Sequence, residues 1–505
     1  MRRCIALLLS ACLIALPSAT GAADVGELTI GLQDDPESLD PLLSWSFVGR
    51  HVLQSLCDKL VDIDQLGQIV PMLATSWDWG NGAKQLTFQL RDGVMFHDGT
   101  PFDASAVRYN IERSLNARGS RRKSDLEAVA AVEVVDRLTV RLKLSRPSTP
   151  VLAALTDRAG MMVSPKAAEA AGDMFYKAPV CAGPYKFVEH KAQDRIVLER
   201  FPGHWRVHDF KIQRIVFRGI PDANVRLVNL KSGQLKLIER LAPTDIAHVS
   251  TDPKLAMIEA PSLGYFGITF NMANGTGLNA TIAKSRLVRE AIDLAIDRDA
   301  INKVVFDGHF EAGNQPFPPS SPFYDRARPI RGRDVALARA KLKEAGAEGL
   351  TFELLVPSDA QRQQVAEVLQ SMLAEAGITM TVQRLELMSL LARAKDGNFQ
   401  AYLVGWSGRV DPDLNIAPLL GCKAGGNDGR YRNPALEEAL EAARTVADAE
   451  KRRELYKPVI GLLLDDLPIS YLYHGRWIFG TRNEVLGFRG YPDGIIRLDG
   501  VALGQ

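Results

Sequence analysis

The sequence predicts an α/β protein built from more than one domain. Its 505 residues exceed what a single hydrophobic core supports, so two or three domains are expected. A strand–helix–strand pattern over residues 351–385 predicts a parallel sheet, and short strands around one helix predict a separate α+β unit within residues 71–183. With 46% hydrophobic and 24% charged residues, the composition is that of an ordinary globular protein.

The first 23 residues have the layout of a secretory signal peptide. Two arginines at positions 2 and 3 precede an apolar run over residues 5–16, and the small residues that follow provide a cleavage site before Asp24. The apolar run is shorter than the roughly 20 residues that span a bilayer. We therefore expect export to the periplasm. The stretch that ends at Cys12 also resembles a lipobox, so a lipid-anchored form is the alternative.

The first half of the mature chain predicts short strands and two helices. Alternating or helically spaced apolar residues mark each segment, and Asp103 is a good N-cap. The expected elements are a strand at Leu28–Leu32, a helix at Val48–Leu60, a strand at Leu86–Leu90, a helix at Ala104–Leu115 and a hairpin over residues 131–144.

The second half carries stronger helical patterns. Asp334 is placed to cap a helix that ends at Gly346, and the unit over residues 351–385 follows it. The expected elements are a helix at Leu287–Ile296, a strand at Thr351–Val356, a helix at Gln361–Ala376, a strand at Ile378–Leu385, a helix at Met388–Lys395 and a strand at Gln400–Val404.

A loop rich in special residues follows the last of these strands. It carries Trp406, Arg409, Asp411 and Asp413 among glycines and a proline. Open α/β sheets bind ligands just beyond the carboxyl ends of their strands, so this loop is a candidate polar pocket. The alternative is a surface loop with an ordinary half-buried tryptophan.

The chemistry of an enzyme, a metal site or a nucleic-acid surface is absent from the sequence. No phosphate-binding glycine loop and no nucleophile elbow occurs, and we expect neither cofactor nor metal. His204 and His208 have metal-ligand spacing for a helix, but the preceding Pro-Gly favours a loop. The 61 basic and 60 acidic side chains balance, which argues against a nucleic-acid partner.

Three cysteines remain after removal of the signal peptide. Cys57, Cys181 and Cys422 are an odd number without metal-site spacing. In an oxidising compartment one disulfide is expected, with Cys181–Cys422 as the suggested pair. Burial of all three as small apolar residues is the alternative.

Four segments carry recognisable motifs. Thr87–Phe102 reads TFQLRDGVMFHDGTPF, Val70–Trp77 is similar to "VPxLAxSW", Cys181–Tyr185 to "GTGPY", and Leu287–Arg298 to "VRQAIAYAIDR". Together they resemble extracellular solute-binding proteins of family 5, the dipeptide-, oligopeptide- and nickel-binding proteins of ABC importers, and Thr87–Phe102 closely resembles the signature of that family. The resemblance covers essentially the whole mature chain.

The resemblance implies a type II periplasmic-binding-protein fold, in which two α/β lobes close around a hinge and an α+β domain is inserted near the start. The expected boundaries are residues 24–70, 184–262 and 483–505 for lobe I, 71–183 for the inserted domain and 263–482 for lobe II. Ligand capture is then a shift of the hinge equilibrium, and no bond is made or broken. The protein is expected to be a monomeric binding protein rather than an enzyme, with ABC permease subunits as its partners.

One departure from the family concerns the ligand. Peptide binders that resemble this chain carry an acidic residue shortly after the loop tryptophan Trp406, where it pairs with the amino terminus of the peptide; here the position holds Arg409. Arginine repels an ammonium and favours a carboxylate. Asp411 is the alternative partner for an amine, and Arg362 is a second candidate for a carboxylate.

The remaining ligand-binding candidates are aromatic and small residues in connecting loops. Trp45, Ser46 and Phe47 follow the first strand, and Tyr265 and Phe266 precede a strand expected at Gly267–Asn271, at a lobe junction. Each has core or hinge packing as its alternative. The sequence thus predicts capture of a small peptide or peptide-like ligand. The alternatives are an opine-like or glutathione-like solute and a nickel chelate.

Overall fold

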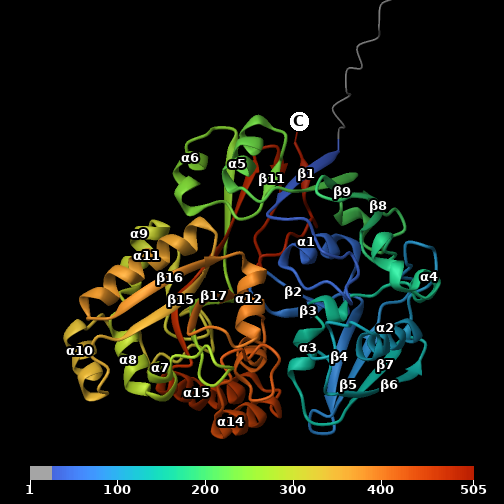
Figure 1. Ribbon diagram of the computed structural model, residues 1–505. Helices are drawn as coiled ribbons and strands as arrows, with labels where there is room; N and C mark the ends of the chain where they lie inside the picture. Colours follow the sequence, from blue (N-terminus) through green and yellow to red (C-terminus); the bar gives the residue numbers. More distant parts are fainter. Residues whose placement is uncertain (1–25, 505) are drawn as a thin grey trace, which may run out of the picture.

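The computed structural model describes residues 26–504, and the predicted signal peptide therefore lies outside the described residues. Three sheets dominate (Figure 1). We call the part around the seven-stranded sheet lobe I, the part around the six-stranded sheet lobe II, and the part around the four-stranded sheet the inserted domain.

Lobe I is built on a mixed sheet in the order β12-β19-β11-β1-β10-β9-β8. Strand β1 pairs in parallel with β10 and β11, and the outer pairs are antiparallel. The strands span β1 Glu27–Leu32, β8 Tyr185–Lys191, β9 Arg195–Arg200, β10 Arg214–Gly219, β11 Leu237–Ile238, β12 Leu255–Pro261 and β19 Arg476–Arg482.

Lobe II is built on the order β14-β18-β13-β17-β15-β16. Strands β15 and β16 are parallel and helix α11 crosses between them, which confirms the predicted strand–helix–strand unit. Gly377, with φ +81°, turns the chain from the helix into the second strand. The elements span β13 Tyr265–Phe270, β14 Glu311–Ala312, β15 Thr351–Pro357, α11 Ala360–Glu375, β16 Thr379–Leu385, β17 Ala401–Trp406 and β18 Ile469–His474.

The inserted domain has its own sheet and its own core. Its order is β4-β5-β7-β6, and the predicted hairpin over residues 131–144 is the antiparallel pair β6 and β7. Asp103 caps α2 by accepting from the backbone N–H groups of Ser105 and Ala106, as predicted. The bounds are β4 Ala74–Gly80, β5 Gln85–Leu90, α2 Ala104–Asn116, β6 Val129–Asp136 and β7 Thr139–Leu144.

The remaining helices flank these sheets (Figure 1). They are α1 Phe47–Leu56, α3 Pro150–Ala154, α4 Pro165–Ala171, α5 Ala223–Ser232, α6 Ile246–Ser250, α7 Ala280–Lys284, α8 Arg286–Leu294, α9 Arg298–Phe306, α10 Val335–Glu344, α12 Leu387–Lys395, α13 Ala417–Leu420, α14 Pro434–Arg444 and α15 Ala449–Asp466. Two small sheets pair β2 Val61–Ile63 with β3 Ile69–Pro71 and β20 Val485–Leu486 with β21 Ala502–Leu503.

Two predictions about this fold were wrong in detail. The helix expected to reach Leu60 ends at Leu56, because the chain turns extended at Cys57 and Leu60 pairs with the backbone of Gly160 and Ala74. The lobe boundary placed after residue 482 is one strand too late, since β19 pairs with β11 and β12 in lobe I.

The chain therefore crosses between the lobes at residues 262–264 and again at Gly475. The two crossings are tied together: Ser262 N–H donates to Gly475 O (3.2 Å), and His474 Nδ1 lies 2.7 Å from Gly264 O. Burial lowers the pKa of His474 to about 4, so its ring is neutral near pH 7. These paired crossings form the hinge.

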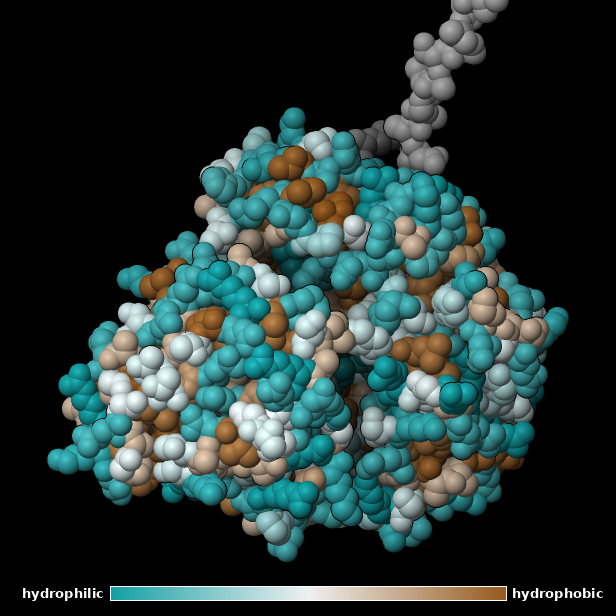
Figure 2. Space-filling model, in the orientation of Figure 1, coloured by the Kyte–Doolittle hydropathy of each residue, from teal (hydrophilic) through white to brown (hydrophobic). Residues whose placement is uncertain are grey.

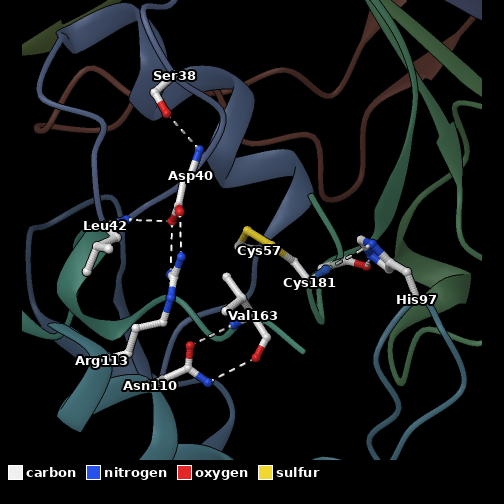
Figure 3. The surroundings of a disulfide bond; sticks show 10 residues. Ser38, Asp40, Leu42, Cys57, His97, Asn110, Arg113, Val163 and Cys181 are labelled. Carbon is white, nitrogen blue, oxygen red and sulfur yellow. Dashed lines mark hydrogen bonds and ion pairs between the residues drawn. A yellow bond between two sulfur atoms is a disulfide. The ribbon is translucent and has the colours of Figure 1, made fainter. Parts of the chain in front are cut away.

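The disulfide joins Cys57 to Cys181, so the suggested Cys181–Cys422 pair was wrong (Figure 3). Cys57 follows α1 in lobe I, and Cys181 lies where the chain returns from the inserted domain. Cys422 sits in lobe II and remains a free, half-buried thiol. The pairing depends on which loops meet in space, and His97 helps to fix it by exchanging hydrogen bonds with the backbone of Cys181.

Loss of this disulfide is expected to lower the free energy of unfolding by about 2–5 kcal/mol. The bond closes a loop with a sequence separation of 124, and a long closed loop restricts the unfolded chain strongly. Urea unfolding of a Cys57→Ser/Cys181→Ser variant measures the loss. Cys422→Ser is the matched control and is expected to stay within about 0.5 kcal/mol. An unchanged midpoint in the double variant would contradict the assignment.

Candidate functional site

The candidate site lies where the three parts of the molecule face one another. Figure 2 shows a hollow between the half that carries lobe II and the half that carries lobe I with the inserted domain. The two sides touch beside it: Thr149 N–H of the inserted domain donates to Arg444 O of lobe II (3.1 Å). The predicted polar loop after β17 reaches this junction through Arg409.

Arg409 is held by its own loop and reaches across to the inserted domain. Its guanidinium lies 5.0 Å from the centre of the Trp406 ring and 3.4 Å from a carboxylate oxygen of Asp157. Asn415 fixes the loop, because its Oδ1 accepts from both Trp406 Nε1 (3.0 Å) and Arg409 N (2.7 Å). Arg409 therefore bridges lobe II and the inserted domain with one-fifth of its side chain still exposed.

The loop after β17 is also fitted closely to the hinge. Gly408 has φ +80°, and a Cβ there would lie 2.2 Å from the carbonyl carbon of Leu263. A Cβ on Gly264 would lie 1.8 Å from the carbonyl oxygen of Trp406. Only glycine fits at both positions, so the loop that carries Arg409 packs directly against the crossing at residues 262–264.

Asp157 is the acidic centre of this junction. Burial by itself would raise its pKa, but Arg50, Arg158 and Arg409 outweigh that cost and hold the pKa well below the usual range. Its Oδ1 accepts from Arg50 Nε at 3.2 Å. Sequence reasoning missed this residue, and the only local sign of it is an unremarkable Asp-Arg pair in a turn.

Asp411 is not available to a ligand amine. It is buried, and its carboxylate accepts from both terminal nitrogens of Arg452, one of them at 2.8 Å. The same carboxylate accepts from the backbone N–H of Asp413 (2.9 Å). Its oxygens are thus used to hold the loop to α15, and the alternative amine site predicted at this position is not present in this arrangement.

Tyr265 also lies away from the hollow. Its side chain is only 3% exposed and packs edge-on against Tyr471 in the core of lobe II, with ring centres 4.7 Å apart. Its neighbour Phe266 is half-buried and stacks on Tyr473 (4.8 Å). Tyr265 faces the same side of the sheet as its cross-strand partner Trp406, and it is burial that removes it: the half-buried Phe266, and not Tyr265, remains a site candidate.

The loop before α1 places the three candidates from lobe I in different roles. Trp45 is 43% exposed, whereas Ser46 caps α1 by accepting from Gly49 N–H (3.0 Å). Phe47 stacks on Trp477 with ring centres 4.7 Å apart and planes within 8°. Ser46 is therefore a structural cap, and Trp45 and Phe47 remain candidates for ligand contact.

Two further arginines, one from each lobe, lie against aromatic rings. The Arg240 guanidinium of lobe I lies 5.0 Å from the Phe47 ring centre and 5.4 Å from that of Trp477. The Arg362 guanidinium of lobe II lies 5.7 Å from the Phe266 ring centre and pairs with Asp359 (3.1 Å). Burial lowers the pKa of Arg240 against the attraction of Glu239, and Arg362 is among the cations that lower it further.

The structure gives the two histidines with metal-ligand spacing a structural setting. His204 is buried and its Nε2 lies 2.9 Å from a carboxylate oxygen of Asp58, while His208 lies in a short 3-10 turn, Val207–Asp209. Among residues 26–504, no three His, Cys, Asp or Glu side chains gather to hold a metal ion. Within the same residues, no helix is both long enough and apolar enough to cross a membrane.

Two α/β lobes joined by paired crossings, with cations and aromatic rings between them, define a binding protein of the type II periplasmic class. The family comparison agrees: a profile of the bacterial extracellular solute-binding proteins, family 5 Middle, matches residues 68–428. The chain belongs to this family, whose members act in transport by binding a solute.

Curated relatives and solved structures match along nearly the whole chain. A glutathione-binding protein, GsiB of Pectobacterium atrosepticum, is 28% identical over 90% of each chain, and a dipeptide-binding protein of Escherichia coli is 28% identical over 97% of each. The structure of AgaA from A. tumefaciens R10 in complex with agropinic acid has a TM-score of 0.84 at 25% identity. It covers 95% of this chain and 99% of that one.

Proposed function

We propose that the protein is the periplasmic solute-binding component of an ABC importer and that it captures a small peptide-like solute without a free amino terminus. It is exported by the signal peptide at residues 1–23, acts as a monomer without catalysis, and delivers its ligand to the permease. Family membership and relatives that are dipeptide- and glutathione-binding proteins support the transport role.

The ion pair between Arg409 and Asp157 carries the ligand assignment. The predicted amine-binding position of the loop holds a cation, and Asp157, the acid nearest to it, is already shared among arginines. Two like charges about 4 Å apart near a protein surface repel by up to about 4 kcal/mol, which a free ammonium beside Arg409 would have to overcome. A blocked or modified amino terminus avoids that repulsion.

The opposite end of the ligand is assigned to Arg240 and Arg362. Each guanidinium lies over an aromatic ring, and the two come from different lobes. A carboxylate between them would draw the lobes together, since closure then completes its coordination. Trp45, Phe47, Phe266 and Trp406 supply apolar walls for the middle of the ligand.

Isothermal titration calorimetry of the refolded mature protein tests this assignment. We expect N-acetyl-alanyl-alanine to bind at least tenfold more tightly than free alanyl-alanine, because only the free peptide places an ammonium beside Arg409. Tighter binding of free alanyl-alanine would contradict the assignment and would class the protein with the binders of free peptides. The titrations should also include an opine and a nickel–histidine chelate. If only one of these binds, the ligand is a non-peptide solute, which is the second candidate function. The likeness to AgaA in complex with agropinic acid favours this second candidate.

A further inference from the structure

Four arginines from three parts of the molecule converge beside Asp157. Arg50 lies in α1 of lobe I, Arg122 follows α2 and Arg158 follows Asp157 in the inserted domain, and Arg409 comes from lobe II. We call them the four-arginine cluster. The side chains of Arg50, Arg122 and Arg158 are 6%, 9% and 4% exposed, so three full charges are withdrawn from water.

The acids within contact do not balance these charges. Asp157 lies 3.2–3.5 Å from Arg50, Arg158 and Arg409. Asp125 pairs with Arg122 at 2.8 Å. Four positive and two negative side chains leave the cluster with a surplus of two positive charges.

The next carboxylate cannot make up the difference. Asp493 is 3.8 Å from Arg50, but both of its oxygens accept from Arg497, at 2.9 and 3.0 Å. Arg497 also pairs with Asp62, which pairs with Lys59. These four residues balance two positive against two negative charges among themselves, so the surplus belongs to the four-arginine cluster.

The cluster also contains nitrogen atoms without acceptors. Arg50 Nη1 and Arg122 Nε are buried and make no hydrogen bond to any described residue, and Arg158 Nε has only its 3.5 Å ion-pair contact with Asp157. A buried donor left unpaired is unfavourable, and the cost is larger when the group is charged. The same crowding acts on protonation, because burial and the neighbouring arginines lower the pKa of Arg158 to about 9. An oxyanion would satisfy the donors and the charge together.

The cluster is partly exposed to solvent. Arg409 keeps 21% of its side chain exposed, Asp125 keeps 33%, and Trp45 in the neighbouring loop is 43% exposed. Backbone carbonyls of Ser44 and Ser46 hold Arg122 and Arg158 from behind, at 3.2 and 3.1 Å. The guanidinium groups are thus fixed in place before a ligand arrives, which reduces the entropy lost on binding.

We propose that the four-arginine cluster binds a carboxylate of the solute, so that the ligand carries an acidic group at the end where peptide binders hold an amine. The inference rests on the proposed function and deepens it: the ligand is acidic at both ends, with Arg240 and Arg362 at the other. Guanidinium forks suit a planar carboxylate, which accepts from two nitrogens at once.

The test uses two probes that differ by one charge. N-succinyl-alanyl-alanine ends in a carboxylate at its blocked end, and the corresponding succinamoyl compound ends in a neutral amide of almost the same shape. We expect calorimetry to give at least tenfold tighter binding of the succinyl compound. An Arg122→Gln variant, which leaves the Arg409 loop intact, is expected to reduce that ratio to less than about threefold, since it removes charged hydrogen bonds to the carboxylate.

Arg137→Gln is the matched control, because Arg137 is 61% exposed and pairs with exposed Asp92 in the same domain. It is expected to keep the wild-type ratio. Equal binding of the two probes by the wild-type protein overturns the inference, while tight binding of N-acetyl-alanyl-alanine would leave the proposed function standing. Binding of free alanyl-alanine alone overturns both. If a folded Arg122→Gln variant keeps the wild-type ratio of the two affinities, the carboxylate does not bind at this cluster and the assignment is overturned. If that variant does not fold, the comparison of the two probes with the wild-type protein decides.

Discussion

An Arg409→Asp variant is expected to bind N-succinyl-alanyl-alanine about 100-fold more weakly than the wild-type protein does. The four-arginine cluster then has three arginines and three acids in place of four and two, so its surplus charge disappears. The new carboxylate would also stand beside Asp157. Removing one partner of a desolvated charge pair costs about 2–5 kcal/mol, and 100-fold corresponds to about 2.8 kcal/mol.

The same variant is expected to gain affinity for free alanyl-alanine, because an acid then occupies the predicted amine-binding position of the loop. Calorimetry with both ligands measures the exchange. Arg384→Asp is the matched control, since Arg384 is 54% exposed and pairs with Glu367 on the surface of lobe II. An Arg409→Asp protein with the wild-type ligand order would show that Arg409 does not select the ligand.

An Arg497→Met variant is expected to lose about 3–5 kcal/mol of the free energy of unfolding. Arg497 is buried and donates to both Asp62 and Asp493, at 2.7 and 2.9 Å. Their attraction raises its pKa well above the usual value despite its burial. Methionine fills similar space but leaves two buried carboxylates facing only Lys59 and the more distant Arg50.

Urea unfolding of the two proteins measures this loss. Arg489→Met is the control, because Arg489 is 49% exposed and pairs with Asp499 near the surface. A surface pair of this kind contributes about 0–1 kcal/mol. Equal midpoints for Arg497→Met and Arg489→Met would contradict the view that the buried pair ties the C-terminal segment to the β2 strand.

Local patterns were enough to predict most of the fold. The parallel pair of β15 and β16 follows from two apolar strands around an amphipathic helix, and Asp103 is recognisable as a cap from its place before α2. Each of these features depends on residues close in sequence. The end of α1 was missed because the partners of Leu60, Gly160 and Ala74, come from the inserted domain.

The candidate site was predicted only in part, for the same physical reason. Arg409 and Trp406 could be found because they follow a recognisable strand. The role of Asp411 was misread because its partner, Arg452, lies 41 residues further along the chain, in α15. Arg50, Arg122 and Arg158 come from separate segments that share no pattern, and only the folded chain brings them together.

The disulfide between Cys57 and Cys181 has a consequence for how this architecture can change. The Cα atoms of the two cysteines are 4.9 Å apart, close to the 3.8 Å between neighbouring residues of a chain. The 123 residues between them therefore leave lobe I and return to it at almost one point, and one hydrophobic core is made mainly from within that stretch. Such a stretch forms a cassette: replacing it as a whole would leave the path of the chain through lobe I unchanged. Because the cassette supplies Arg122, Asp157 and Arg158, its exchange would carry ligand preference from one binding protein to another.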